Sequence, residues 1–214
     1  MDQTVLLVVL FIVAYLLGSI PTAYLVGLLR GIDIFKVGSG NMGATNIVRA
    51  TGKMGWGALV WFFDSAKSVI AVLIGQRVMP DSLALATVVT SIGVMVGHNW
   101  SIFVMIITGK LRGGKGAAAA FGTLLTVVPV QVIAGMLALF LVILARTRFV
   151  SLGVLMMFGL AVVWIAVLIL QQLIQVEYIV YILAVYALLL LRFRENIERL
   201  LAGTERRIGE SSGL

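Results

Sequence analysis

The chain has 214 residues, of which 61% are hydrophobic and only 12% are charged, and its mean hydropathy is +1.13. Soluble domains are about half apolar and about a quarter charged, so this composition excludes an ordinary soluble enzyme and a disordered chain. The absence of cysteine excludes disulfides, and a single histidine argues against a metal site. The net charge of +7 is expected to mark cytoplasmic loops beside anionic lipid, and no nucleic acid partner is predicted.

Apolar blocks that could cross a bilayer follow one another along the chain, since a spanning helix needs about 20 apolar residues. They cover about 4–29, 56–75, 83–107, 149–170 and, slightly shorter, 176–191. The block 117–145 is too long for one span, and Pro129 near its middle predicts a break into two short helices. Lys and Arg residues concentrate in connections that this topology places on one side of the membrane.

We therefore predict an all-α, polytopic integral membrane protein with about seven transmembrane helices, the N-terminus outside and the C-terminus cytoplasmic. Residues 1–214 are expected to form a single membrane domain with a short cytoplasmic amphipathic tail at about 192–214. Within that tail, Ile197 and Leu200 oppose Arg194 and Arg199, which predicts a short helix over 194–207 at the inner interface.

A run of small and polar residues, here called the first loop (38–46), follows the first apolar block. Gly38, Gly40 and Gly43 allow successive backbone N–H groups to point into one concavity, which favours an anion. Hydrogen-bonding side chains come from Ser39, Asn41, Thr45 and Asn46. Arg49 adds planar donors that fit phosphate oxygens. The alternative is a flexible connection between helices, but such connections rarely combine so many polar groups with arginine.

A second glycine-rich segment, here called the lysine loop (109–116), fits the G-x-x-x-x-G-K order of a P-loop from Gly109 to Lys115 and also contains Gly113. Gly116 stands where a P-loop needs Ser or Thr for magnesium, and the segment follows a membrane helix instead of a strand, so nucleotide hydrolysis is excluded. What remains is a glycine turn with one lysine before a helix at Ala117, whose N-terminus favours an anion. The alternative is a basic anchor on the cytoplasmic side.

Three further polar residues are candidates for the site or its support. His98 is the only imidazole and is either structural or catalytic; the H-x-x-x-x-D motif of classical glycerolipid acyltransferases is absent, because Phe103 stands at the Asp position. Asp64 and Lys67 lie three residues apart in an apolar block, where charges are costly. One turn of helix brings them together, so we predict that they form an ion pair with each other; the alternative is a pairing with a polar group of the site.

These motifs, in their order along the chain, resemble the bacterial membrane acyl-phosphate:glycerol-3-phosphate acyltransferases (the PlsY type). The residues that carry the resemblance are the first loop with Arg49, Gly97-His98 leading to the lysine loop, and Asn196-Ile197 with Arg199 to Glu205. The pair Asp64 and Lys67 and the segment 149–152 also fit. The resemblance implies a seven-helix membrane fold with its motifs on the cytoplasmic side. It also implies transfer of a fatty acyl group from acyl phosphate to the 1-hydroxyl of glycerol 3-phosphate, giving lysophosphatidate and phosphate.

The resemblance implies a role for each matching residue. The expected catalytic residues are Ser39, Arg49, Lys115, Asn196 and His98. The expected substrate-binding residues are Gly38, Gly40, Asn41, Gly43, Thr45, Asn46, Gly113, Gly114, Gly116 and Ser151. Asp64, Lys67 and Glu205 are expected to support the structure. No cofactor or metal is expected. The resemblance also implies a location in the bacterial inner membrane and functional coupling of this protein to an enzyme that forms acyl phosphate.

Two departures from the family pattern keep alternatives open. Phe193 stands at the histidine of H-R-x-N-I, and Val154 at the second serine of S-L-x-S. Each loss removes a hydrogen bond worth about 1–3 kcal/mol if buried. The chain is then either a working acyltransferase or a catalytically altered or inactive relative. A membrane binder or transporter of a phosphorylated solute would need polar residues across its outer half, and few occur there.

Overall fold

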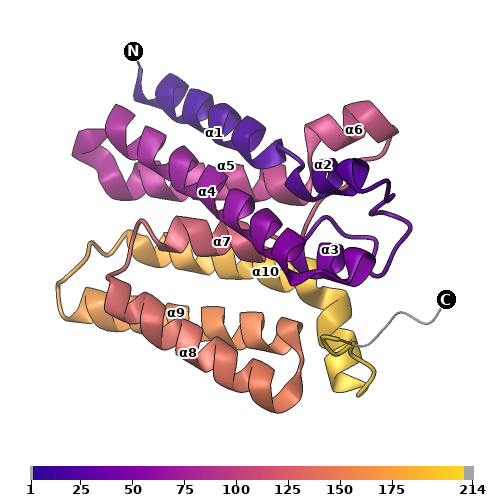
Figure 1. Cartoon of the computed structure of the whole chain (residues 1–214). Helices are drawn as coiled ribbons and strands as arrows, with labels where there is room; N and C mark the ends of the chain where they lie inside the picture. The colour runs from indigo at the N-terminus through magenta and orange to yellow at the C-terminus, as the bar shows by residue number, and fades with distance from the viewer. Residues whose placement is uncertain (1, 210–214) are drawn as a thin grey trace. The chain divides into compact units, whose positions relative to one another are not determined.

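Helices make up the regular secondary structure of the described residues. A computed structural model describes residues 2–209, and within that range it contains ten α-helices, one short 3-10 turn (Pro80–Ser82) and no β-strand (Figure 1). The helices are α1 Gln3–Ser19, α2 Thr22–Leu29, α3 Ala44–Thr51, α4 Met54–Val78, α5 Leu83–Asn99, α6 Ile102–Thr108, α7 Ala117–Leu124, α8 Val130–Thr147, α9 Val150–Leu170 and α10 Tyr178–Leu201. This confirms the predicted all-α class.

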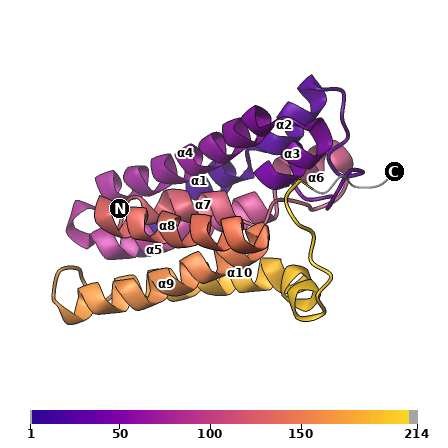
Figure 2. The same ribbon diagram turned by 60° about the horizontal axis from the view of Figure 1, so that its bottom comes forward.

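The described residues divide between Thr126 and Val127 into two compact units. The first unit contains α1 to α7, with α1 against α5 and α4, and α7 also against α4. The second contains α8 to α10, and α9 packs against both of the others (Figure 2). The single domain expected over the whole chain stays a prediction.

Five segments of the described chain are long and apolar enough to cross a bilayer. They are Gln3–Leu29, Met54–Val78, Pro80–Asn99, Val130–Thr147 and Val150–Leu170. Large apolar side chains such as Ile12, Phe62, Leu141 and Val163 are exposed on these helices, as expected for surfaces that face lipid. The predicted count of about seven spans and the orientation of the termini stay predictions.

Proline and serine divide two of the apolar blocks. The first block is interrupted at Ile20 and Pro21, because a residue before proline is driven out of the helical region. The block expected at 83–107 ends at Asn99, and Ser101 begins a separate helix by accepting a hydrogen bond from Val104 N. The predicted break at Pro129 is confirmed, with α7 ending at Leu124 and α8 beginning at Val130.

The predicted tail helix is wrong. The structure has no separate helix over 194–207, because α10 runs without interruption to Leu201 and residues 204–207 are not helical. Residues 178–201 contain neither glycine nor proline, so nothing in them ends the helix at the membrane boundary. Residues 210–214 of the predicted tail lie outside the described residues.

Glycines bring α1 and α5 into close contact. A Cβ atom at Gly97 would lie 2.0 Å from Tyr15 O, and one at Gly18 would lie 2.1 Å from Val94 O. Small residues of this kind let membrane helices approach to backbone contact. Ser101 Oγ then donates to Ser19 O, and Tyr15 Oη donates to Trp100 O at 3.0 Å. The end of α1 is thereby fixed beside the end of α5.

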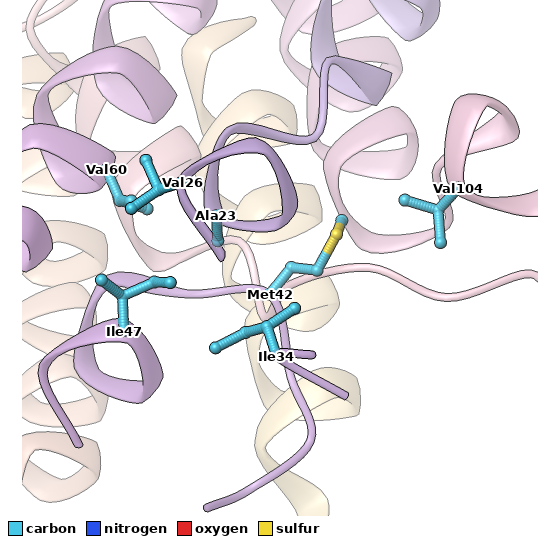
Figure 3. Packing of buried hydrophobic residues seen from close by; sticks show 7 residues of the cluster. All are labelled: Ala23, Val26, Ile34, Met42, Ile47, Val60 and Val104. Atoms are coloured by element: carbon cyan, nitrogen blue, oxygen red, sulfur yellow. The ribbon is translucent and has the colours of Figure 1, made fainter. Parts of the chain in front are cut away.

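A buried apolar cluster anchors the first loop to the helices of its unit (Figure 3). Ile34 precedes the loop and Met42 belongs to it, and both are almost fully buried. Their neighbours in the cluster are Ala23 and Val26 of α2, Ile47 of α3, Val60 of α4 and Val104 of α6. Burial of a side chain of this size contributes about 1.5–3 kcal/mol to the stability of the fold. The cluster therefore holds the polar part of the loop in a defined position.

Candidate functional site

The first loop is shaped by one asparagine. The Asn46 Nδ2 group donates to Ile34 O at 3.1 Å and Val37 O at 3.0 Å, while its Oδ1 accepts from Ser39 N at 2.9 Å. Both donor hydrogens are therefore used by backbone carbonyls just before the loop, so Asn46, expected to bind substrate, organises the backbone of this segment. A Cβ at Gly38, where φ is +60°, would lie 2.3 Å from Asn46 Oδ1. This position therefore requires glycine.

Arg49 and the remaining polar residues of the first loop lie around this core. Arg49 is half-buried on α3, and its Cδ would lie 3.7 Å from a Cβ at Gly38. The half-buried residues Ser39, Asn41 and Thr45 lie in or next to the loop. The structure thus brings the predicted arginine to the glycine turn that was expected to bind an anion.

The lysine loop lies directly against the first loop and the end of α5. Met42 N donates to Gly113 O at 3.3 Å, and Gly114 N donates to His98 O at 2.9 Å. A Cβ at Gly113 would lie 2.3 Å from His98 O, and one at Gly114 would lie 2.1 Å from His98 Nε2. Only glycine permits these approaches. Two motifs separated by about seventy residues in the sequence therefore form one backbone surface.

The lysine loop ends at the start of α7. Gly116 has φ +82° and precedes Ala117, the first residue of that helix. The first α-helical hydrogen bond runs from Ala120 N to Gly116 O at 2.7 Å, so the amides before Ala120 are not used by the helix ladder. Lys115 is half-buried beside them. A positive side chain and helix amides outside the ladder together favour an anion.

Asp64 and Lys67 form the predicted ion pair, deep in the first unit. Lys67 Nζ lies 2.7 Å from Asp64 Oδ1, and both residues are more than 90% buried. Thr22 Oγ1 donates to the same oxygen at 3.0 Å, and Lys67 Nζ donates to Ile20 O at 2.8 Å. The pair therefore satisfies backbone and side-chain groups at the break between α1 and α2. Thr22 is a member of this network that sequence reasoning missed; its only signal was its place after Pro21.

His98 joins this network to the lysine loop. The imidazole is almost fully buried, and its Nδ1 lies 3.6 Å from Asp64 Oδ1. Its Nε2 side faces Gly114, and its backbone carbonyl accepts the Gly114 N–H. The ring thus lies between a buried carboxylate and the glycine turn. This geometry can hold the loop in place.

The buried pair predicts a large effect on stability. Lys67→Met leaves the Asp64 carboxylate buried without its counter-charge, so we expect a loss of about 3–5 kcal/mol in the free energy of unfolding. The double variant with Asp64→Asn should recover much of it, because the uncompensated charge is gone. Thermal unfolding of the purified protein in lipid nanodiscs measures both.

Lys36→Met is the matched control for this experiment. Lys36 forms an exposed pair with Asp33 at 3.3 Å, and exposed pairs contribute about 0–1 kcal/mol. An unfolding curve for Lys67→Met that matches the Lys36→Met curve would contradict a structural role for the pair.

The second unit holds a separate polar cluster around Glu205, here called the Glu205 cluster. The buried carboxylate accepts from Ser151 Oγ at 2.9 Å, Asn196 Nδ2 at 2.6 Å and Arg199 Nε at 2.9 Å. The cluster ties the start of α9 and the end of α10 to the segment after α10. Sequence reasoning named Ser151, Asn196 and Glu205 as site or support residues, whereas it placed Arg199 on the polar face of the expected tail helix and not in the site.

The two departures from the family pattern also lie in the second unit. Phe193 on α10 and Val154 on α9 are both buried. Within the described residues, no group of three His, Asp or Glu side chains is placed to hold a metal ion. The predicted site residues are thus divided between the units, with Ser39, Arg49, His98 and Lys115 in the first and Ser151, Asn196 and Glu205 in the second.

Comparisons with known proteins agree along almost the whole chain. The profile of the family described as "Glycerol-3-phosphate acyltransferase" matches residues 8–203. Glycerol-3-phosphate acyltransferase 2 of Moorella thermoacetica is 40% identical over 202 residues, which cover 94% of this chain and 97% of the relative. The enzyme named glycerol-3-phosphate acyltransferase of Thermus thermophilus is 40% identical over 201 residues, covering 93% and 94%.

Solved structures give the same result. The crystal structure of the integral membrane glycerol 3-phosphate acyltransferase PlsY in its glycerol 3-phosphate form has a TM-score of 0.82 and 35% identity, covering 95% of this chain and 96% of the other. The lysophosphatidic acid form has a TM-score of 0.80 and 34% identity, covering 95% of each chain. An integral membrane fold with several apolar helices is shared by these proteins and this chain.

Proposed function

The chain belongs to the glycerol-3-phosphate acyltransferase family, and from this premise we propose that it transfers a fatty acyl group from an acyl phosphate to the 1-hydroxyl of glycerol 3-phosphate. The products are lysophosphatidate and inorganic phosphate. The observation that carries the proposal is the junction of the first loop with the lysine loop through Met42 N and Gly113 O. It places two glycine turns, with Arg49 and Lys115, in one unit.

Each substrate brings one phosphate group, and the site offers two kinds of positive group. Arg49 presents a planar set of donors that suits two phosphate oxygens, while Lys115 acts as a compact charge beside the helix amides. Ser39, Asn41 and the loop amides orient the phosphates through hydrogen bonds. Fixed donors of this kind stabilise charge that develops in the transition state.

The chemical step needs no covalent intermediate on the protein. The 1-hydroxyl oxygen attacks the acyl carbonyl carbon, a carbon–oxygen bond forms, and the bond between the carbonyl carbon and the phosphate oxygen breaks. The phosphate leaves with the bonding pair, and a phosphate oxygen accepts the hydroxyl proton. Because the acyl phosphate is already activated, positioning of the two substrates supplies most of the acceleration.

We assign His98 a positioning role in this reaction, although the sequence pattern placed it among the catalytic residues. Its imidazole is buried between Asp64 and Gly114, so it packs against the lysine loop and helps to hold that loop in place. Asn196 stays a predicted catalytic residue and Ser151 a predicted substrate contact. In the second unit both donate to Glu205, which fixes the orientation of their side chains.

We place the reaction at the cytoplasmic face of a bacterial inner membrane. The exposed basic residues Lys36, Lys53 and Lys110 lie in the connections that carry or adjoin the two loops, and positive residues favour the cytoplasmic side. The acyl chain of the donor would remain in the bilayer. An enzyme that forms acyl phosphate is then the expected functional partner.

The donor is tested by offering three acyl compounds to the purified full chain in lipid nanodiscs. With labelled glycerol 3-phosphate, we expect lysophosphatidate from palmitoyl phosphate and none above background from palmitoyl-coenzyme A or palmitate. Equal rates from palmitoyl phosphate and palmitoyl-coenzyme A would show that the donor assignment is wrong, while acylation of glycerol 3-phosphate itself would still stand.

A further inference from the structure

Asn99 is a buried polar residue that the reaction described above does not use. It is the last residue of α5 and is fully buried, and within the described chain neither atom of its carboxamide has a hydrogen-bond partner. Among the residues described, the only other buried side-chain atom in this condition is Ser91 Oγ. An unpartnered buried polar group costs about 1–3 kcal/mol, and such groups in native proteins commonly have a functional reason.

The carboxamide lies against the lysine loop. A Cβ at Gly116 would lie 3.0 Å from Asn99 Oδ1 and 3.4 Å from its Nδ2. The backbone of Asn99 also lies beside Gly113, where a Cβ would be 2.4 Å from Asn99 O. Both atoms of the amide are therefore next to the turn that carries Lys115. Their neighbourhood is the proposed binding loop and not a remote part of the core.

The chemistry of the carboxamide selects the kind of ligand group. It presents a donor, Nδ2, and an acceptor, Oδ1, side by side, and neither has a partner among residues 2–209. A phosphate dianion only accepts hydrogen bonds, so it would leave Oδ1 unpaired and would repel it. A hydroxyl group both donates and accepts, and so it can satisfy both atoms.

Glycerol 3-phosphate carries two hydroxyl groups, and only one of them remains unchanged in the reaction. The 1-hydroxyl must lose its proton during attack, and a carboxamide cannot accept that proton. We propose that Asn99 hydrogen-bonds the 2-hydroxyl of glycerol 3-phosphate and is a specificity-determining residue. This assignment rests on the proposed function. Asn99 is fully buried behind Gly116, so this contact requires the backbone at Gly116 to shift when the substrate binds.

The test compares glycerol 3-phosphate with propane-1,3-diol monophosphate, which keeps a primary hydroxyl and the phosphate but lacks the 2-hydroxyl. The wild-type chain in lipid nanodiscs should prefer glycerol 3-phosphate in kcat/KM. In Asn99→Leu this preference should fall by about tenfold, the value of one good hydrogen bond. A site that pairs with a substrate hydroxyl discriminates strongly against the analogue without it.

Ser91→Ala is the matched control, because it also removes a buried unpartnered polar atom from α5. It should keep the wild-type preference. Replacing an unpartnered amide by an apolar group of similar shape is close to neutral for stability, so Asn99→Leu should fold. If Asn99→Leu does not fold, the smaller replacement Asn99→Ala allows the same comparison of the two acceptors.

The affinity for each acceptor, measured by calorimetry, separates this proposal from the proposed function. A preference for glycerol 3-phosphate that is lost in both Asn99 variants supports the assignment even if turnover fails. If both variants keep the wild-type preference, the amide serves only the fold or a bound water, and the assignment is wrong. Absence of turnover in the wild-type chain would instead count against the acyltransferase reaction.

Discussion

Arg49→Ala and Lys115→Ala are each expected to abolish turnover while the protein still folds. Both side chains are half-buried beside glycine turns of the first unit, so neither supports the core as Asp64 and Lys67 do. Removing one preorganised donor to developing charge lowers the rate by about 100- to 1,000-fold, and two phosphates share only these positive groups in the proposed site. Initial rates of lysophosphatidate formation in nanodiscs measure the loss.

Lys110→Ala is the matched control for this pair of variants. Lys110 is exposed in the same lysine loop and has no place in the proposed site, so its variant should keep close to the wild-type rate. Arg49→Lys adds a sharper comparison, because it keeps the charge but loses the planar pair of donors. Wild-type turnover in either alanine variant would rule out the model of two phosphates held by Arg49 and Lys115.

Glu205→Ala is expected to destabilise the second unit severely. The change leaves the Arg199 guanidinium and the buried side chains of Ser151 and Asn196 without the carboxylate that accepts from all three. The Arg199 side chain is partly exposed, so most of the effect comes from the buried Ser151 and Asn196 side chains, for each of which loss of this hydrogen bond costs about 1–3 kcal/mol. We expect a lower unfolding temperature and faster proteolysis after α10. Glu205→Gln should also destabilise, because its amide nitrogen would face donors.

Glu195→Gln is the control for Glu205. Glu195 lies on α10 with an exposed carboxylate 3.9 Å from Arg199, so its loss should change stability by about 1 kcal/mol or less. If Glu205→Ala unfolds at the wild-type temperature but has no activity, then Glu205 acts on substrate and is not a structural residue.

Much of the fold could be predicted because membrane helices are defined by their composition. The long apolar blocks predicted the helices, and Pro129 predicted the break before α8. The break at Pro21 was missed because the apolar residues continue on both sides of it. The break at Ser101 depends on tertiary contacts. The Ser101 N–H donates to Arg112 O, and the Ser101 hydroxyl donates to Ser19 O. No local pattern contains that information.

The site could be predicted in its parts but not in its internal bonding. Glycines next to Arg49 and Lys115 indicated anion loops, and the structure brings those loops together. Asn46 resembled a substrate ligand in sequence, yet its donors are used by carbonyls of its own segment. Asn99 lies in the polar stretch around His98 but was given no role, because its unpartnered amide is visible only once the lysine loop is folded against it. Spacing predicts helical neighbours such as Asp64 and Lys67, whereas contacts between distant loops need the fold.

The most direct test of the acyltransferase assignment is phosphate release by the purified wild-type chain in lipid, given palmitoyl phosphate with and without glycerol 3-phosphate. The proposed reaction predicts release that depends on glycerol 3-phosphate, with one lysophosphatidate formed for each phosphate. Phosphate release that is the same without glycerol 3-phosphate, or no release with it, would contradict the assignment. The latter result would favour an inactive relative, in which the buried Phe193 and Val154 stand where the family pattern has polar residues.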